Sequence, residues 1–280
     1  MVPLLAALPW IDEVLSDEDA PGKAWWHGAW RLSRVLRSRR FDLAVVSNPK
    51  KRLHLSVWLA GVPRRVGYHR KWGWLLTHRL PDRKALGDRH EVEYNLDLIR
   101  ALGASTVAAP WPLPIGESSQ ALRLLRASGI GESQPFIAVH PWSSNPLKVW
   151  PLERYQELIR LLVERLAAPV VLIGGEEHSG QSRVVLPNGT PAIDLVGRLS
   201  LNELAGVLQR ARLLVSNDSG PVHLASAVGL KTVVLFGTPD PATGPVRWGP
   251  WGAGHTVIWK PSMDAIGVEE VFAAVRGEWG

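Results

Sequence analysis

Beyond residue 135, short apolar runs alternate with stretches in which apolar residues recur at helical spacing. The apolar runs predict buried strands at 136–140, 169–175, 213–217 and 231–237. The helical stretches predict helices at 151–166, 200–211, 221–229 and 267–277. This alternation predicts a parallel sheet with helices on both faces, and ligands of such sheets bind at the carboxyl ends of the strands.

Residues that typically begin or end helices stand at the borders of these stretches. Pro151 is expected at the first helical position, where its missing N–H costs nothing. Ser200, with Glu203 three residues later, has the capping-box pattern. Gly229 is expected to close the helix that precedes the last of these strands.

The first half of the chain is less regular and predicts fewer strands. It predicts one strand at 41–48, helices at 53–61, 91–103 and 118–130, and a proline-rich approach to a linker at 109–117. We therefore predict two domains, residues 1–133 and residues 134–280. His90 lacks a second histidine at metal-binding spacing, so we interpret it as the start of a helix.

The composition is that of a globular chain, and its 280 residues are enough for two domains. The absence of cysteine excludes disulfides and thiolate metal sites and is compatible with a reducing compartment. The start of the chain lacks a signal-peptide pattern, and no apolar run approaches the roughly 20 residues of a membrane span. We therefore expect a cytoplasmic protein.

Basic residues are concentrated between Arg31 and Arg89, where sixteen lysines and arginines stand against three acidic residues. Because the whole chain has a formal net charge of +6, the remainder is net negative. This asymmetry favours an anionic partner, such as a phosphorylated substrate, an anionic lipid or a nucleic acid; the alternative is a solvated surface in an arginine-rich composition. The sequence lacks a recognised nucleic-acid-binding motif, so we do not expect a nucleic-acid partner.

The turn after the strand at 213–217 has residues suited to a phosphate. A helix beginning at Ser219 and Gly220 presents free N–H groups and a partial positive charge, and Gly220 lets a ligand approach the backbone. His223 could donate to the same phosphates, and Asp218 could cap the helix or bind a sugar hydroxyl. An ordinary helix cap beside a packed histidine is the alternative.

Three other strand ends carry candidate ligand groups. Ser143 and Ser144 can donate hydrogen bonds, and Lys148 could neutralise charge on a departing phosphate or be an ordinary surface lysine. Glu177 can accept from ribose hydroxyls, or can serve as an acidic residue at a helix N-terminus. The turn at 237–238 can offer backbone and hydroxyl donors, or can be a loop without a ligand.

Other common chemistries are not indicated. The sequence has no P-loop, no G-x-G-x-x-G, no H-E-x-x-H and no G-x-S-x-G pattern. It also has no cluster with metal-ligand spacing. We therefore expect neither a metal nor a cofactor.

Five stretches, in order along the chain, resemble glycosyltransferase family 9, the ADP-heptose:lipopolysaccharide heptosyltransferases and their relatives. They are LAGVPRRVGYHRKWGWLLTHRLP (59–81), HEVEYNLDLIRALG (90–103), HPWSSNPLKVWPLERY (140–155), LIGGEEH (172–178) and NDSGPVHLASAVGLKTVVLFGTPDP (217–241). The resemblance implies an α/β, GT-B-like fold, with two Rossmann-like domains and a cleft between them.

The resemblance also implies an activity. It implies inverting, metal-independent transfer of a heptose-like sugar from an ADP-type nucleotide sugar to a lipopolysaccharide-core or related glycan acceptor. Lys148 and Asp218 would be catalytic, Glu177 would hold the ribose, and Leu199 would lie beside the adenine. The full substrate-binding set would be Ser143, Ser144, Lys148, Glu177, Leu199, Asp218, Ser219, Gly220 and His223. An anionic glycolipid acceptor would bring the basic front half into peripheral contact with the inner face of the cytoplasmic membrane.

The chain departs from the family pattern at its start. The family begins with a strand and a glycine-aspartate turn that carries the proposed general base, whereas MVPLLAALPWIDEVL resembles the family's segment after the second strand. We therefore expect the first βαβ segment to be missing, the front domain to be incomplete, and transfer to be weak or absent with donor binding less affected. The alternatives are a non-catalytic nucleotide-sugar-binding protein or an inactive truncated copy.

Overall fold

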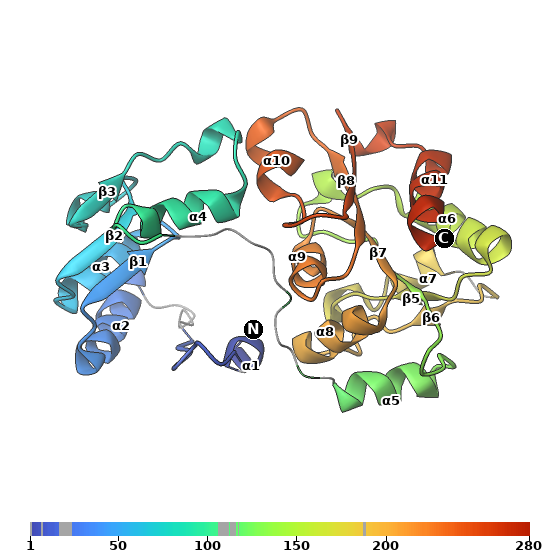
Figure 1. Cartoon of the computed structure of the whole chain (residues 1–280), viewed down its shortest axis with the longest axis horizontal. Helices are drawn as coiled ribbons and strands as arrows, with labels where there is room; N and C mark the ends of the chain where they lie inside the picture. Colours follow the sequence, from blue (N-terminus) through green and yellow to red (C-terminus); the bar gives the residue numbers. More distant parts are fainter. Residues whose placement is uncertain are drawn as a thin grey trace. The chain divides into compact units, whose positions relative to one another are not determined.

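The structure, a computed structural model, divides into two compact units (Figure 1). It describes residues 2–6, 8–16, 24–105, 112, 116, 118–186 and 189–280. The N-terminal unit is Val14–Ala108; the C-terminal unit is Ala109–Gly280 together with Met1–Glu13. The predicted approach to a linker at 109–117 lies almost wholly outside the described residues, and the division into domains at residue 133 stays a prediction.

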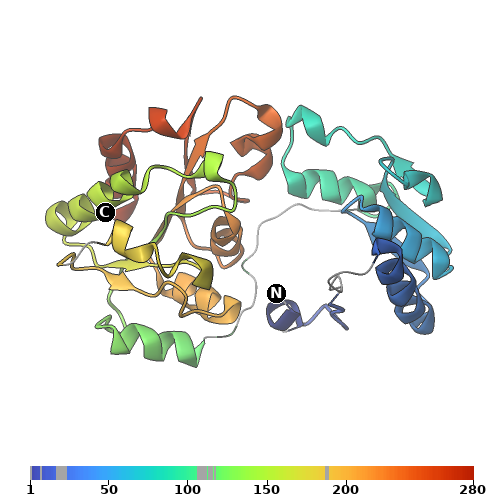
Figure 2. The same ribbon diagram turned by 180° about the vertical axis from the view of Figure 1, so that it is seen from behind.

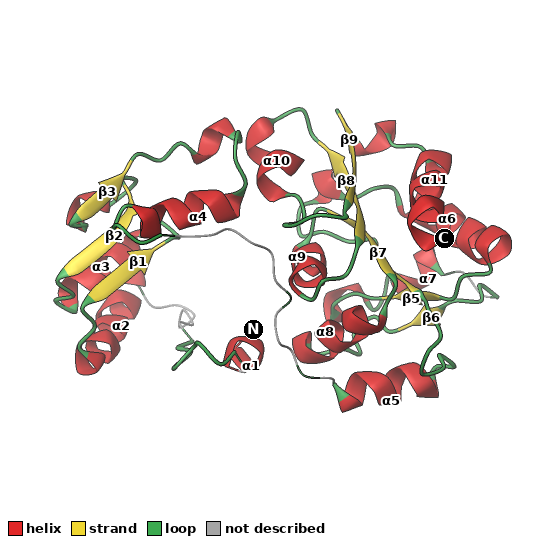
Figure 3. Cartoon of the chain, in the orientation of Figure 1, coloured by secondary structure: helices red, strands yellow, loops and turns green. Residues whose placement is uncertain are grey.

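The C-terminal unit is built on a six-stranded sheet in which every pair of neighbouring strands is parallel (Figure 3). In spatial order its strands are β6 (Ile193–Asp194), β5 (Val170–Leu172), β4 (Ile137–His140), β7 (Leu213–Asn217), β8 (Thr232–Gly237) and β9 (Thr256–Lys260). Numbered within the unit, this is the order 3-2-1-4-5-6 of a dinucleotide-binding Rossmann sheet. The four central strands confirm the predicted runs, whereas β6 and β9 at the two edges were not predicted.

Helices cover both faces of this sheet (Figures 1 and 2). One face packs against α6 (Leu152–Leu166), α7 (Ser182–Val185) and α11 (Val268–Trp279). The other packs against α1 (Val2–Ala6), α5 (Ser119–Ala127), α8 (Leu201–Arg210) and α9 (Gly220–Ala227). Alternation along β4 explains the two layers, because Ile137 and Val139 belong to the first core and Ala138 to the second.

The N-terminal unit has a smaller sheet of three parallel strands, in the order β1-β2-β3. These strands are β1 (Leu43–Val46), β2 (Arg64–Tyr68) and β3 (His78–Leu80). Its helices are α2 (Trp25–Arg39), α3 (Lys51–Leu59) and α4 (Glu91–Arg100). Val66 and Tyr68 pack against α4 on one face, while Ala44 and Val46 pack with α2 and α3 on the other. Helix α2 and strands β2 and β3 were not predicted.

Several predicted helix borders are confirmed at the atomic level. Ser200 and Glu203 form a complete capping box at the start of α8, and Gly229 has a left-handed φ of 80° just beyond α9. His90 is the N-cap of α4, and its side chain accepts a hydrogen bond from the N–H of Val92. Pro151 is the N-cap of α6 rather than its first helical residue.

The remaining short elements lie in the connections. They are the helix α10 (Pro245–Trp248) and the 3-10 turns η1 (Gly73–Leu75), η2 (Lys84–Leu86), η3 (Pro146–Lys148), η4 (Glu176–His178), η5 (Pro241–Thr243) and η6 (Met263–Ala265). Turns η3 and η4 follow β4 and β5 directly in the chain, so the C-terminal ends of these strands lead into short turns with polar residues.

Candidate functional site

The direction of chain winding reverses between β4 and β7. After β4 the chain adds β5 and β6 on one side, and it then returns to add β7, β8 and β9 on the other. His140 and Ser216 are register partners at the carboxyl ends of these two neighbouring strands. The connections that leave β4 and β7 therefore lead to helices on opposite faces of the sheet, α6 and α9, and open α/β sheets bind ligands at such a point.

The two loops are joined by an ion pair. The ammonium of Lys148, in η3, lies 2.5 Å from a carboxylate oxygen of Asp218, which follows β7. Ser143 adds a hydrogen bond of 3.3 Å from its hydroxyl to the backbone carbonyl of Asp218. The Asp218 side chain is 9% exposed, so Lys148 compensates a nearly buried carboxylate.

The hypothesis that Asp218 caps the next helix is wrong. Ser219 is the N-cap of α9, and no side chain caps this helix. The carboxylate of Asp218 is turned to Lys148 instead. The start of α9 therefore carries backbone N–H groups without a side-chain acceptor and the positive end of the helix dipole.

The side chain of Ser219 is held in place by residues at the carboxyl ends of β4 and β7. Its hydroxyl lies 3.1 Å from Nδ1 of His140 and 3.0 Å from the hydroxyl of Ser216. Gly220, the first residue of α9, is exposed, and a Cβ added there would have no atom within 4 Å. The backbone at the helix start is thus positioned by buried side chains and open on its outer side, as close approach by a phosphate requires.

His140 is kept neutral by its surroundings. Burial, with the nearby His178 as a smaller cause, lowers the pKa of His140 to about 3. The ring is 7% exposed, and Nδ1 is shared between the hydroxyls of Ser216 and Ser219. A neutral imidazole suits this role, because it positions Ser219 without introducing a charge into the core.

Asn217 fixes the strand ends that carry the site. Its side-chain amide donates to the carbonyl of Pro141 at 2.7 Å, and its side-chain oxygen accepts from the N–H of Trp150 at 3.2 Å and the hydroxyl of Tyr155 at 2.9 Å. These partners belong to the loop after β4 and to α6. Asn217 and His140 were missed as site residues, although a polar residue ending an otherwise apolar strand is a signal for each.

A stacked pair of rings joins the loop after β4, which carries Trp142, to the turn η4 after β5, which carries His178. The indole of Trp142 stacks on His178 with centroids 4.8 Å apart and planes 6° apart. A Cβ on Gly174 would lie 2.6 Å from the Trp142 ring, so only glycine fits there without movement. Glu177 is adjacent to this stack and 70% exposed, which leaves its carboxylate accessible to a ligand.

The other predicted site residues occupy more separate positions. Ser144 is exposed in the loop after β4, and His223 is exposed in the first turn of α9. Leu199 is half-buried just before α8 and packs against the second core of the C-terminal unit. Among the predicted residues, described contacts join Ser143, Lys148 and Asp218.

The turn after β8 has a packing role. A Cβ on Gly237 would lie 2.1 Å from the backbone nitrogen of Met263, so the absence of a side chain lets η6 approach closely. Thr238 hydrogen-bonds through its hydroxyl to that of Thr243 at 2.9 Å. The interpretation of the turn at 237–238 as a ligand site stays a prediction.

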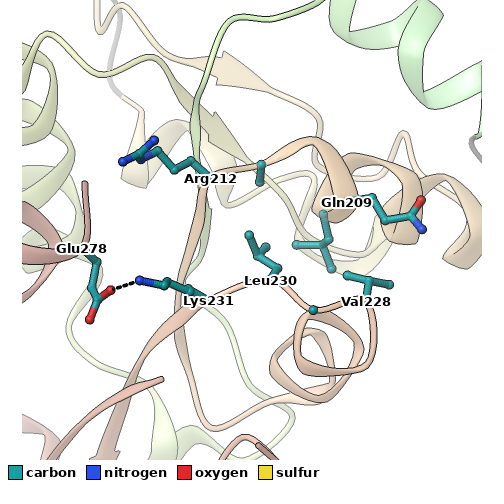
Figure 4. A pocket seen from close by; sticks show the side chains of 9 residues that line it. Gln209, Arg212, Val228, Leu230, Lys231 and Glu278 are labelled. Atoms are coloured by element: carbon teal, nitrogen blue, oxygen red, sulfur yellow. Dashed lines mark hydrogen bonds and ion pairs between the residues drawn. The ribbon is translucent and has the colours of Figure 1, made fainter. Parts of the chain in front are cut away.

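A separate pocket of about 300 Å³ opens near the amino ends of the strands of the same sheet (Figure 4). Arg212 and Lys231 line it, and they directly precede β7 and β8. Lys231 is paired with Glu278 at 3.0 Å. Because this pocket lies at the amino ends of the strands, it is distinct from the site at their carboxyl ends.

The residues that the structure describes contain no group of three or more histidine or acidic side chains arranged to hold a metal ion. Among the helices in that part of the chain, none has the length and apolar character to cross a membrane.

Comparison with known proteins gives the family. The sequence profile of "Glycosyltransferase family 9 (heptosyltransferase)" matches residues 29–271. The chain belongs to glycosyltransferase family 9. Membership supports glycosyl transfer as the general activity of this family 9 chain. A curated relative, lipopolysaccharide heptosyltransferase 3 of Escherichia coli, is 25% identical over 98% of this chain and 83% of its own length.

Solved structures give the same fold. A glycosyl transferase family 9 protein from Veillonella parvula matches with a TM-score of 0.85 and 24% identity, over 98% of this chain and 84% of its own. The ADP-heptose lipopolysaccharide heptosyltransferase II of E. coli matches with a TM-score of 0.80 and 23% identity, over 99% and 86%. The predicted GT-B-like α/β fold is confirmed for this family 9 chain.

Proposed function

We propose that this family 9 chain transfers a heptose-like sugar from an ADP-type nucleotide sugar to a lipopolysaccharide-core or related glycan acceptor. The observation that carries the proposal is the ion pair of Lys148 with Asp218, which directly precedes the uncapped start of α9 at the reversal point of the sheet. The names of two similar proteins agree, since one is a lipopolysaccharide heptosyltransferase and the other an ADP-heptose lipopolysaccharide heptosyltransferase.

The donor diphosphate would bind where positive charge is already fixed. The N–H groups of Ser219 and Gly220 would donate to its oxygens, and the ammonium of Lys148 would lie beside the departing phosphate. Asp218 would hold that ammonium in place and accept from a sugar hydroxyl. Ser143, Ser144 and His223 would add donors; Glu177 would hold the ribose, and Leu199 would lie beside the adenine.

The transfer would be a direct displacement with inversion and without a metal. The acceptor hydroxyl oxygen would bond to the anomeric carbon, the bond from that carbon to the diphosphate oxygen would break, and a general base would take the hydroxyl proton. Lys148 and the α9 dipole would stabilise the charge that develops on the diphosphate. We assign no general base to a described residue.

Calorimetry with ADP and ADP-heptose tests the proposal. Binding by the parent chain, with a large loss of affinity in Lys148→Ala, is expected. Lys231→Ala is the matched control, because Lys231 lies at the amino ends of the strands and is also ion-paired. Equal binding by the parent and Lys148→Ala would contradict the site. Donor binding without sugar transfer to any glycan acceptor would favour a non-catalytic binding protein.

A further inference from the structure

The N-terminal unit exposes a group of tryptophans on α2 and the adjoining turn η1. Trp25, Trp26 and Trp30, in the first two turns of α2, are 43%, 52% and 54% exposed. Trp74 in η1 is 61% exposed. Trp72 joins the two elements, with its ring 5.3 Å from that of Trp25 and 6.3 Å from that of Trp74. We call these five residues the tryptophan surface.

The spacing along α2 explains why these rings stay outside. Ala29 and Ser33 form the buried face of the helix. Trp26 and Trp30 are four residues apart, so they lie in one row beside that face, and Trp25 lies on its other flank toward Trp72. Large exposed aromatic groups of this kind mark interaction sites, since soluble surfaces rarely gather them.

Positive charge accompanies the rings. Helix α2 carries four arginines and no acidic residue. The guanidinium of Arg34 lies 5.0 Å from the Trp30 ring centroid and extends the row of Trp26 and Trp30 by one more turn. Lys71, exposed beside Trp72, acts electrostatically on His54 of α3 and lowers the pKa of that buried ring as a smaller cause than burial itself.

We propose that the tryptophan surface, with the arginines of α2, docks this protein on an anionic lipid bilayer. Indole rings prefer the boundary between headgroups and acyl chains, and arginine and lysine near the surface are attracted by anionic lipids. The absence of acidic residues from α2 matches an anionic surface. The inference deepens the proposed function and rests on it in one respect: a glycolipid acceptor would be presented at such a surface.

Sedimentation of the full chain with lipid vesicles tests the docking without using sugar transfer. The protein is expected to bind vesicles of phosphatidylcholine and phosphatidylglycerol, and to bind pure phosphatidylcholine far less. Trp26→Ala/Trp30→Ala and, separately, Arg34→Glu are each expected to weaken binding about tenfold or more, and added salt should weaken it too. Circular dichroism would establish that the variants are folded.

Matched controls come from the C-terminal unit. Trp259 is 48% exposed in β9, and Arg183 is exposed in α7. Trp259→Ala and Arg183→Glu remove the same kinds of group elsewhere and should leave vesicle binding unchanged. Vesicle binding that is absent, or equal in the parent and the α2 variants, would overturn the proposal.

A glycan is the other occupant to examine. If a lipid-free phosphorylated core oligosaccharide binds the parent but not Trp26→Ala/Trp30→Ala, while vesicles bind neither, the surface holds the acceptor glycan and the bilayer proposal is wrong. Failure of the donor-binding experiment would instead contradict the proposed function and leave the vesicle result standing.

Discussion

Lys148 and Asp218 are seventy residues apart in the chain and form an ion pair of 2.5 Å between the loops that follow β4 and β7. Each side chain affects the position or the charge of the other. Asp218 holds the ammonium at the start of α9, and Lys148 compensates a carboxylate that would otherwise repel a diphosphate. The pair thus predefines a position for an anion without leaving an isolated buried charge.

Replacing Lys148 should therefore lower the affinity for the donor more than it lowers the stability of the fold. Lys148→Ala deletes one charge-assisted contact and exposes the donor to Asp218. We expect a loss of about 1.5 to 3 kcal/mol in ADP binding, or roughly 10- to 150-fold in affinity. Calorimetry measures it. Lys148→Ala/Asp218→Asn should regain part of the loss because the repulsion is gone; no recovery in this double variant would argue against electrostatic coupling of the pair.

A side chain on Gly220 should obstruct the ligand and leave the unit folded. The space around its Cβ position is empty to 4 Å, so Gly220→Val should change the melting temperature little. Its isopropyl group would stand where phosphate oxygens approach the backbone, and donor affinity should fall at least about tenfold. Gly220→Ala is the smaller control and should lose less. Normal donor binding by Gly220→Val would place the diphosphate elsewhere.

The buried His140 should make stability depend on acidic pH. Its folded pKa of about 3 is below the unfolded value, so the neutral ring's stabilisation is complete above about pH 6.5 and decreases as the pH falls toward 3. The decrease amounts to at most about 5 kcal/mol. His140→Asn keeps a polar group near Ser219 and does not titrate. Urea unfolding of both proteins from pH 7 to pH 4 should show a steeper loss in the parent; parallel curves would contradict this prediction.

Substitutions at Gly174 and Trp142 should have strongly non-additive effects on the free energy of unfolding. A methyl group on Gly174 overlaps the indole, so Gly174→Ala should destabilise the protein by about 1 to 3 kcal/mol. In a Trp142→Leu background, where the ring is gone, the same methyl should cost much less. A double-mutant cycle by chemical denaturation measures the difference. Equal costs in both backgrounds would show that the loop relaxes freely.

The central strands and the site turns were predictable because their signals are local. Continuous apolar runs mark β4, β7 and β8, which are buried on both faces, and Ser200 with Glu203 marks the start of α8. The edge strand β6 has only two residues and so leaves no run to detect. Helix α2 was missed because its exposed tryptophans and arginines obscure a narrow buried face.

The contacts between the residues of the candidate site were less predictable than the identity of those residues. Lys148, Asp218 and Ser219 were expected from the turns, but the role of Asp218 depends on which side chain crosses from the neighbouring loop. Local sequence favoured a helix cap. The register of β4 against β7 places Lys148 within reach instead, and this register arises from two strands seventy-six residues apart. The hydrogen bond that Asn217 of β7 accepts from Tyr155 of α6 also depends on long-range pairing, so it could not be predicted from the local sequence.

The shape of the six-stranded sheet also bears on self-association. At one border, β6 offers two residues of backbone, and the side chain of Asp194 is engaged with the N–H of Val196. At the other border, β9 runs for five residues with Val257 and Trp259 exposed. Short, charged borders discourage intermolecular strand addition, whereas longer apolar ones invite it. Of the two borders of this sheet, β9 is therefore the one more open to strand addition by a neighbouring molecule.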